Sequence, residues 1–200
     1  MNKILMVSAL LALSACNNNE SGRPSEAAKH AEPPAANSAE THAKQAVQLF
    51  FKTCVATGAD EKALAGVAAQ GKLLLLNEAK KQEFNFEPQA RQVWGAHTQE
   101  GGRFFLVSSK QYCSVKAKTA DPQTIEQEMA QLAAQTADSL GVKAEKVKEE
   151  VSPDIPTAKQ TAYALQPKGQ PNEILLVVHT NSNPQAPAQA ALNFHWVPVK

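Results

Sequence analysis

Residues 121–141, DPQTIEQEMAQLAAQTADSLG, carry the strongest structural signal in the chain. Asp121 can cap a helix, Pro122 suits its first turn, and Gly141 can end it. One apolar stripe recurs at helical spacing and comprises Ile125, Met129, Leu132, Ala133, Thr136 and Leu140. The other side carries Gln123, Gln127, Gln131 and Gln135. We interpret these glutamines as a solvated face, the alternative being a low-charge partner surface.

Strand patterns lie on both sides of this helix. Before it, 92–99 and 103–109 flank Glu100-Gly101-Gly102, whose glycines accept the positive φ of a tight turn, and 112–118 alternates as a third strand. After it, three strands are predicted at 159–166, 173–181 and 189–197. The patterns of 73–91 and 142–157 leave helix and strand open.

Two helices are predicted near the start of the folded part. The first begins after Thr41, ends near Gly58, and has an inward face of Ala43, Val47, Phe50, Phe51 and Cys54. The second runs from Asp60 to Gly71, and the run Leu73–Leu76 that follows is expected to be buried. Because helices and strands occur in blocks, we predict an α+β fold, with an antiparallel sheet of about five to six strands and helices on one face.

The first fifteen residues have the pattern of an export signal. Lys3 is followed by an apolar run, Ile4–Leu13, of about ten residues, which is shorter than the roughly 20 that a membrane span needs. Leu13-Ser14-Ala15-Cys16 resembles the lipobox of bacterial lipoproteins at all four positions. The resemblance implies a signal peptide at 1–15 and a diacylglycerol on Cys16, whose amino terminus is usually acylated, for example with palmitate. The alternative is an ordinary cleaved signal with a chance cysteine.

A polar stretch follows the lipobox cysteine. From residue 17 to residue 42 there is no Leu, Ile, Val or aromatic residue, so this stretch lacks the apolar surface that folding requires. We predict that 16–42 is a lipidated cysteine with a disordered tether, and that 43–200 is a single α+β domain. Asn17 in place of Asp favours the outer membrane, by the sorting rule of enteric bacteria. Whether the domain faces the periplasm or the cell surface stays open.

The charge balance excludes several classes of partner. The chain has 20 Lys and Arg against 19 Asp and Glu, and loss of Lys3 with the signal leaves the two equal. A nucleic-acid groove or a polyanionic tail needs an excess of one sign. We therefore expect no nucleic-acid partner, and we expect attachment to the membrane through lipid on Cys16.

The three cysteines divide into one for lipid and one pair. Once Cys16 is assigned to lipid, Cys54 and Cys113 remain, and the envelope outside the inner membrane is oxidising. We predict a structural disulfide between them. A redox role is disfavoured because the sequence has no Cys-x-x-Cys, and a catalytic thiol because Cys54 sits on an apolar helix face.

A second resemblance covers about half of the domain. Cys54-Val55-Ala56-Thr57, Asp60, a helix ending at Gly71, Trp94, a Gly-Gly turn and Cys113-Ser114-Val115 resemble a family of small exported or lipid-anchored proteobacterial proteins, the neisserial lipoproteins among them. The family has no established activity. The resemblance therefore implies export and the cysteine pair, and no reaction.

One segment is similar to a phosphate-binding loop. Gly66–Lys72 matches the first seven positions, but Leu73 replaces the Ser or Thr that should hold magnesium, and the segment ends a predicted helix instead of following a strand. We expect no nucleotide and no other cofactor.

Other candidate groups lack the spacing of a site. His97, His179 and His195 all fall on predicted strands and are weak candidates for a zinc or copper site, because no pair has ligand spacing. Ser108 and Ser109 lack a nucleophile elbow. The pairs Glu126 with Glu128 and Glu149 with Glu150 are interpreted as solvated charges.

Aromatic residues are expected to fill or rim the sheet, the alternative being a platform for a glycan or peptide; they are Trp94, Phe104, Phe105, Tyr112, Phe194 and Trp196. Together these features predict a lipid-anchored envelope protein that binds another envelope component, protein or glycan, without catalysis. Two alternatives stay open. One is a hydrolase-like envelope enzyme whose site leaves no local motif, and the other is a surface antigen or adhesin.

Overall fold

The computed structural model describes residues 36–83, 86, 89–110 and 112–199, which all belong to one compact unit. The predicted signal peptide at 1–15, Cys16 and the predicted tether as far as residue 35 lie outside the described residues. Within the described part, no helix is long and apolar enough to cross a membrane.

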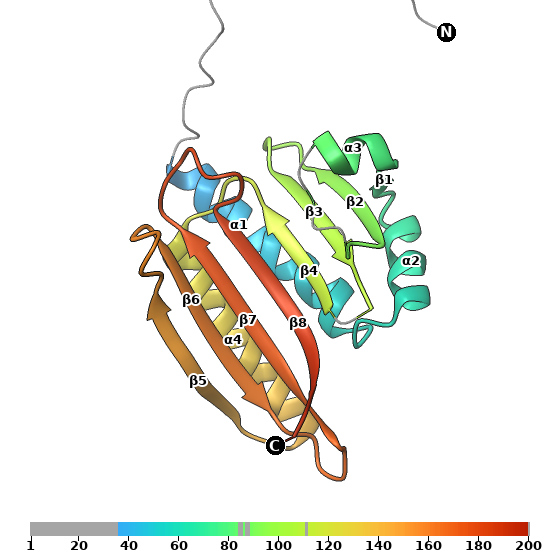
Figure 1. Cartoon of the computed structure of the whole chain (residues 1–200), viewed down its shortest axis with the longest axis vertical. Coiled ribbons are helices and arrows are strands. Elements are labelled where there is room, and N and C mark those ends of the chain that lie inside the picture. Colours follow the sequence, from blue (N-terminus) through green and yellow to red (C-terminus); the bar gives the residue numbers. More distant parts are fainter. Residues whose placement is uncertain (1–35, 84–85, 87–88, 111, 200) are drawn as a thin grey trace, which may run out of the picture. The chain divides into compact units, whose positions relative to one another are not determined.

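One antiparallel sheet organises the described residues (Figure 1). Its eight strands are β1 (Leu74–Leu75), β2 (Gln92–His97), β3 (Arg103–Ser108), β4 (Tyr112–Ala117), β5 (Ala144–Val151), β6 (Ala158–Leu165), β7 (Asn172–Asn181) and β8 (Ala190–Pro198). The α+β class and the single antiparallel sheet are confirmed, but the expected five to six strands was wrong. The two missed strands, β1 and β5, come from the segments whose pattern left helix and strand open.

The sheet consists of two meanders whose last strands meet. Its order is β1-β2-β3-β4-β8-β7-β6-β5, and β4 pairs with β8 so that Cys113 lies opposite Phe194. A long helix comes before each meander, α1 (Ala36–Phe50) before the first and α4 (Pro122–Leu140) before the second. Both helices pack against each other and against the same face of the sheet, as predicted (Figure 1).

Shorter helices complete the first half of the chain. α1 continues into a five-residue π-helix, η1 (Phe51–Val55), which was not predicted. α2 (Glu61–Gln70) follows the predicted start at Asp60, whose side chain caps the helix by accepting a hydrogen bond from the Ala63 amide at 2.8 Å. α3 (Glu78–Glu83) lies between β1 and β2 in the sequence.

The main core lies between the sheet and the two long helices. Side chains alternate along each strand, so that Leu106, Val115, Leu176 and Leu192 turn toward the helices and are fully buried. They pack in one cluster with Ile125 and Met129 of α4, Phe50 of α1, and other apolar residues. A second, smaller cluster of Ala90, Val93 and Val107 lies on the other face. The alternation thus assigns each strand residue to one of two faces.

The predicted boundaries of α4 are confirmed. Asp121 accepts a hydrogen bond from the Thr124 amide at 2.7 Å, and Gly141 takes the left-handed conformation, with φ of 66°, that ends the helix. All the predicted stripe is buried except Leu140, which is 40% exposed. At the last turn Ala137 takes the inward position instead, and Leu140 lies at the edge of the packed surface.

α1 begins at Ala36, inside the stretch assigned to the tether. Tertiary contacts hold this first part of the helix. His42 is buried, and its Nε2 donates a hydrogen bond to the carbonyl oxygen of Glu100 at 3.1 Å. The amide of Asp121, the α4 cap, donates to the carbonyl oxygen of Ala39 at 3.0 Å. Polar contacts of this kind leave no apolar pattern in the sequence, which is why the earlier start was missed.

The expectation that the Leu73–Leu76 run is buried was wrong for its centre. Leu74 and Leu75 are 69% and 55% exposed, because β1 is a two-residue strand at the edge of the sheet. The opposite edge, β5, is rich in Lys and Glu and carries a β-bulge between Lys146 and Lys148. A very short strand at one edge and a charged, bulged strand at the other are common ways to block pairing with further chains.

The two glycines of the hairpin turn have different roles. Gly101 has the positive φ that was predicted, 82°, whereas Gly102 does not and is required by close packing instead. A Cβ atom at Gly102 would lie 2.8 Å from Cε2 of Phe104 and 2.9 Å from Cδ2 of His42. The α1 helix therefore packs directly on the backbone of this turn.

Gly102→Ala is expected to lower the free energy of unfolding by about 1–3 kcal/mol, the usual cost of overpacking. Gly66→Ala is the control, since Gly66 lies inside α2 with no atom within 4 Å of an added Cβ. Its helix propensity should stabilise the protein by roughly 0.5–1 kcal/mol. Urea denaturation of both variants measures the difference. Equal effects of the two substitutions would contradict the close approach of α1 to the turn.

Candidate functional site

The described domain contains an apolar groove of about 600 Å³. It lies where η1 and the loop after it, the last turns of α4, the loop between β6 and β7, the start of β7 and the end of β8 come together. Its lining residues are Phe51, Val55, Ala56, Gly58, Gln135, Thr136, Ser139, Leu140, Pro167, Gln170, Ile174, Phe194 and Trp196. None of the described side chains that line the groove is charged. The groove can therefore accept apolar groups but offers no ion pair.

Three large apolar side chains of the groove reach solvent. Phe51, Leu140 and Trp196 are 48%, 40% and 43% exposed. They come from η1, α4 and β8, so segments far apart in the sequence supply one apolar surface. An exposed apolar surface of this kind in a monomer commonly marks a binding site.

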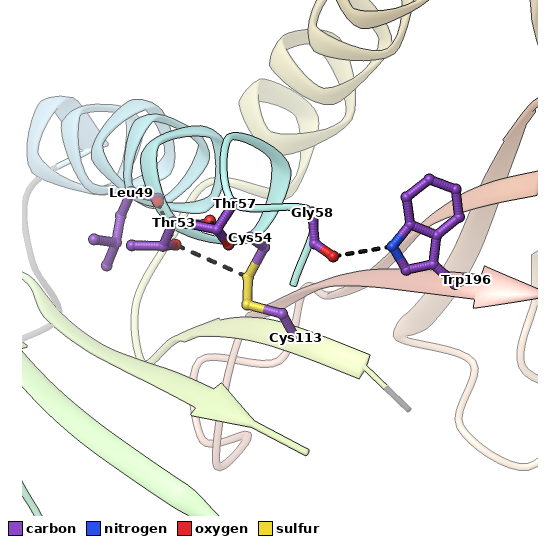
Figure 2. The surroundings of a disulfide bond; sticks show 7 residues. All are labelled: Leu49, Thr53, Cys54, Thr57, Gly58, Cys113 and Trp196. Atoms are coloured by element: carbon purple, nitrogen blue, oxygen red, sulfur yellow. Dashed lines mark hydrogen bonds between the residues drawn. A yellow bond between two sulfur atoms is a disulfide. The ribbon is translucent and has the colours of Figure 1, made fainter. Parts of the chain in front are cut away.

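The π-helix shapes one wall of the groove. Isolated π-turns inside or after α-helices often occur at functional sites. Thr53 donates a hydrogen bond to the Leu49 carbonyl and Thr57 donates to the Thr53 carbonyl, both at 2.6 Å (Figure 2). The turn leaves Phe51 exposed, so its predicted inward position was wrong, whereas Cys54 points inward and is fully buried.

The predicted disulfide is confirmed and fastens this wall to the sheet. Cys54 of η1 is joined to Cys113 of β4, with their Cα atoms 5.4 Å apart (Figure 2). Both cysteines are fully buried. The pair therefore serves structure, and a buried disulfide does not supply the exposed thiolate that thiol catalysis needs.

Trp196 forms the other side of the groove mouth. Its Nε1 donates a hydrogen bond to the carbonyl oxygen of Gly58 at 2.9 Å (Figure 2), and its ring meets that of Phe194 edge to face at 5.7 Å. The loop it contacts contains Ala59 with φ of 62°, a conformation that costs energy for a non-glycine residue. Such backbone positions cluster at binding and active sites.

A second, smaller cavity of about 350 Å³ adjoins the same tryptophan. Its lining residues are Ala59, Ser109, Lys110, Tyr112, His195, Trp196 and Val197. The rings of Tyr112 and His195 lie 5.7 Å apart across β4 and β8. Unlike the groove, this cavity has a charged side chain, Lys110, among its lining residues. We call it the polar cavity.

The three strand histidines are not brought together. His195 lines the polar cavity, and His179 lies on the same face of the neighbouring strand, β7. The pKa of His179 lies below its ordinary value because its surroundings desolvate the ring, and the charges of Lys148 and His195 lower it further. His97 lies at the end of β2, opposite Arg103. The described residues contain no group of three or more His, Cys, Asp or Glu that could hold a metal ion.

Most of the other candidate residues from the sequence lie at a helix end, on the solvent face of α4 or in the core. Gly66–Lys72 covers the end of α2 and its cap, so its amides are not at the helix N-terminus that holds phosphate. Ser108 is fully buried on β3, and Ser109 lines the polar cavity. Of the aromatic candidates, Trp94, Phe104 and Phe194 are buried and fill the core. The glutamines of α4 are exposed, as expected for a solvated face, and Gln135 also lines the groove.

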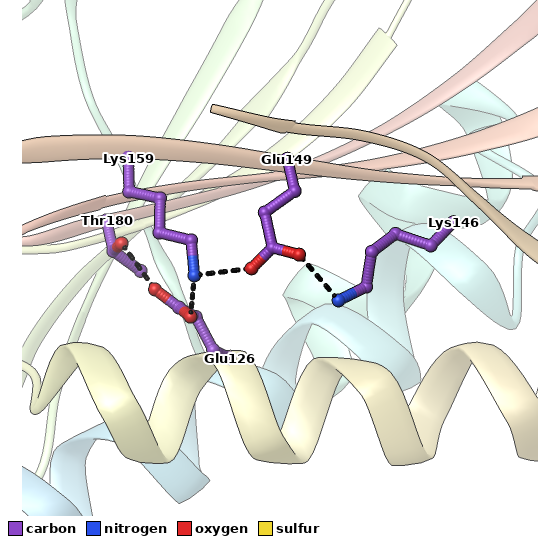
Figure 3. Close-up of polar contacts among 5 residues, drawn as sticks. All are labelled: Glu126, Lys146, Glu149, Lys159 and Thr180. Atoms are coloured by element: carbon purple, nitrogen blue, oxygen red, sulfur yellow. Dashed lines mark hydrogen bonds and ion pairs between the residues drawn. The ribbon is translucent and has the colours of Figure 1, made fainter. Parts of the chain in front are cut away.

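Two carboxylates expected to be solvated form an ion-pair network instead (Figure 3). Nζ of Lys159 lies 2.6 Å from Oε2 of Glu126 and 2.8 Å from Oε1 of Glu149, and Lys146 pairs with Glu149 at 2.9 Å. Thr180 donates a hydrogen bond to Glu126 at 3.1 Å. Hydrogen bonds from Lys146 and Lys159 lower the pKa of Glu149 to about 2. A general acid at neutral pH needs a raised pKa, so this network links α4 to the sheet and does not suit proton transfer.

Sequence reasoning missed the groove as a site. Phe194 and Trp196 had been noted as aromatics of the sheet, but residues such as Ser139, Pro167 and Gln170 have no local pattern that marks them. Comparison of the chain with protein-family models, curated proteins and solved structures finds no match.

Proposed function

We propose that this chain is a lipid-anchored protein of the bacterial cell envelope, and that its domain is a non-catalytic binding module with the apolar groove as its site. The observation that carries the proposal is the groove itself. Its volume of about 600 Å³ falls within the range of about 300–1,000 Å³ that is usual for ligand sites. Its apolar walls and uncharged polar rim are also typical of such sites.

The envelope location is supported by the N-terminal sequence. The lipobox Leu13-Ser14-Ala15-Cys16 follows Lys3 and an apolar run, and the domain resembles small exported lipoproteins of the neisserial type. Asn17 supports the outer membrane, on either its periplasmic or its outer side. The binding partner is then another envelope component.

The chemistry of the groove favours an apolar group over a glycan. The hydroxyl groups of a glycan need hydrogen-bond partners when they lose water, and the walls of the groove offer few. An acyl chain or an apolar protein segment needs none, and gains from burial against Phe51, Leu140 and Trp196.

The polar cavity supports binding better than hydrolysis. Ser109 and His195 both line it, which is the feature that a hydrolase-like site would require. No Asp or Glu of the described residues lines it, however, and a serine–histidine pair is normally oriented by a carboxylate.

A neutral, apolar fluorescent probe, N-phenyl-1-naphthylamine, tests the groove. Saturable binding with enhanced fluorescence is expected for the purified domain. Trp196→Ala and Phe51→Ala should each weaken binding by about tenfold, the equivalent of about 1.4 kcal/mol of lost apolar contact.

Ile155→Ala is the matched control, because Ile155 is an exposed apolar residue that does not line the groove. It should bind the probe as the wild type does. Circular dichroism confirms that each variant is folded. Absence of saturable binding, or equal binding by all the variants, would overturn the groove as the site.

A further inference from the structure

The apolar groove and the polar cavity are adjacent and share a wall. Trp196 lines both. On the opposite side, Gly58 lines the groove and the next residue, Ala59, lines the polar cavity. The hydrogen bond from Trp196 Nε1 to the Gly58 carbonyl therefore marks the boundary between an apolar and a polar compartment.

The polar cavity exists because β4 is shorter than β8. β4 begins at Tyr112, which pairs with His195, so Trp196 and Val197 have no partner among the described residues of β4. On their other side both still pair with β7, Trp196 with Ile174 and Val197 with Glu173. A notch is left in the sheet beside the last residues of β8. The groove on the helix-covered side reaches this notch at Trp196.

The two compartments differ in charge. Among the described residues, no charged side chain lines the groove, whereas the polar cavity is lined by Lys110 together with His195 and by no Asp or Glu. Lys110 is exposed, so it can meet an anion without being removed from water. An occupant that spans both compartments would place an apolar part in the groove and a negative charge beside Lys110.

We infer that the ligand is a long-chain fatty acid, with its acyl chain in the groove and its carboxylate at Lys110. This inference rests on the proposed function and specifies its ligand. A single acyl chain suits an apolar groove of about 600 Å³ that has Trp196 in its wall. A small anionic head suits a cavity of about 350 Å³ with one lysine.

Displacement of N-phenyl-1-naphthylamine by palmitoleate and by palmitoleyl alcohol tests the assignment. The two compounds have the same chain and differ in the charge of the head. At pH 8 and low salt, the acid should compete at about fivefold lower concentration than the alcohol, as expected for one solvent-exposed ion pair. At 0.5 M NaCl this preference should shrink.

Lys110→Gln should abolish the preference for the acid and leave competition by the alcohol unchanged. Lys44→Gln is the control, because Lys44 is an exposed lysine of α1 that lines neither compartment. This variant should keep the wild-type preference.

The outcomes separate the inference from the proposed function. If the probe binds but acid and alcohol compete equally, or if Lys110→Gln keeps the preference, the carboxylate site is overturned and the groove stands. If lysophosphatidate competes better than palmitoleate and depends on Lys110, a phosphate-headed lipid replaces the fatty acid. If the probe itself fails to bind, the proposed function fails first.

Discussion

Removing the disulfide by Cys54→Ala together with Cys113→Ala is expected to lower the free energy of unfolding by about 4 kcal/mol. The two cysteines are 59 residues apart in the sequence, so the bond closes a long loop in the unfolded chain. In the chain-entropy treatment, closing a loop of that length stabilises the folded protein by about 4 kcal/mol. Both cysteines are fully buried in the core cluster, so their loss also removes packed atoms.

Guanidinium denaturation of the oxidised wild type and the double variant measures this effect. Dithiothreitol provides an internal control, because it should destabilise the wild type to a similar extent and leave the double variant unchanged. Alkylation without reduction, followed by mass spectrometry, should label neither cysteine of the wild type. A difference below about 1 kcal/mol would show that the bond does not constrain the unfolded chain as expected.

Cys16→Ala is expected to move the full chain from the membrane fraction to the soluble fraction. A single acyl chain holds a protein only reversibly, whereas two or three chains on Cys16 would hold it essentially permanently, at about 0.8 kcal/mol for each buried methylene. Once Lys3 is lost with the signal, positive and negative side chains are equal in number. Attraction to anionic lipids therefore does not replace the lost anchor.

Fractionation after a carbonate wash, with immunoblotting, measures the distribution. The Cys54→Ala, Cys113→Ala variant is the matched control, because it loses two cysteines and keeps Cys16, and it should remain with the membranes. Mass spectrometry of the N-terminal peptide should find the acyl groups on wild-type Cys16. Unchanged pelleting of Cys16→Ala would overturn the anchor.

The elements with strong local signals were predicted well. α4 has a capping aspartate, a proline in its first turn and a terminal glycine, all of which act within a few residues. β2, β3, β4, β6, β7 and β8 show alternation or apolar runs between turns, and each was expected close to its observed position. The disulfide could be predicted because only two cysteines remain after Cys16 is assigned to lipid.

The errors have a common physical cause. Leu74 and Leu75 are apolar but exposed, because their two-residue strand lies at the edge of the sheet. The first turns of α1 are polar but ordered, because His42 and Ala39 contact the Glu100 turn and the Asp121 cap. Local composition carries no information about which distant segment lies beside a residue.

The sequence by itself determined the type of most elements, which depends on spacing within one segment, where the periods of 2 and 3.6 residues act. It also determined the pair of cysteines, because only two remain once Cys16 is assigned to lipid. Only the tertiary structure decided that the two meanders meet through β4 and β8, and that β8 extends past the start of β4. The groove and the polar cavity both depend on that meeting, because Trp196 lies where β8 has lost its β4 neighbour. Strand order is set by contacts between residues far apart in the chain, so no local pattern could have placed the site there.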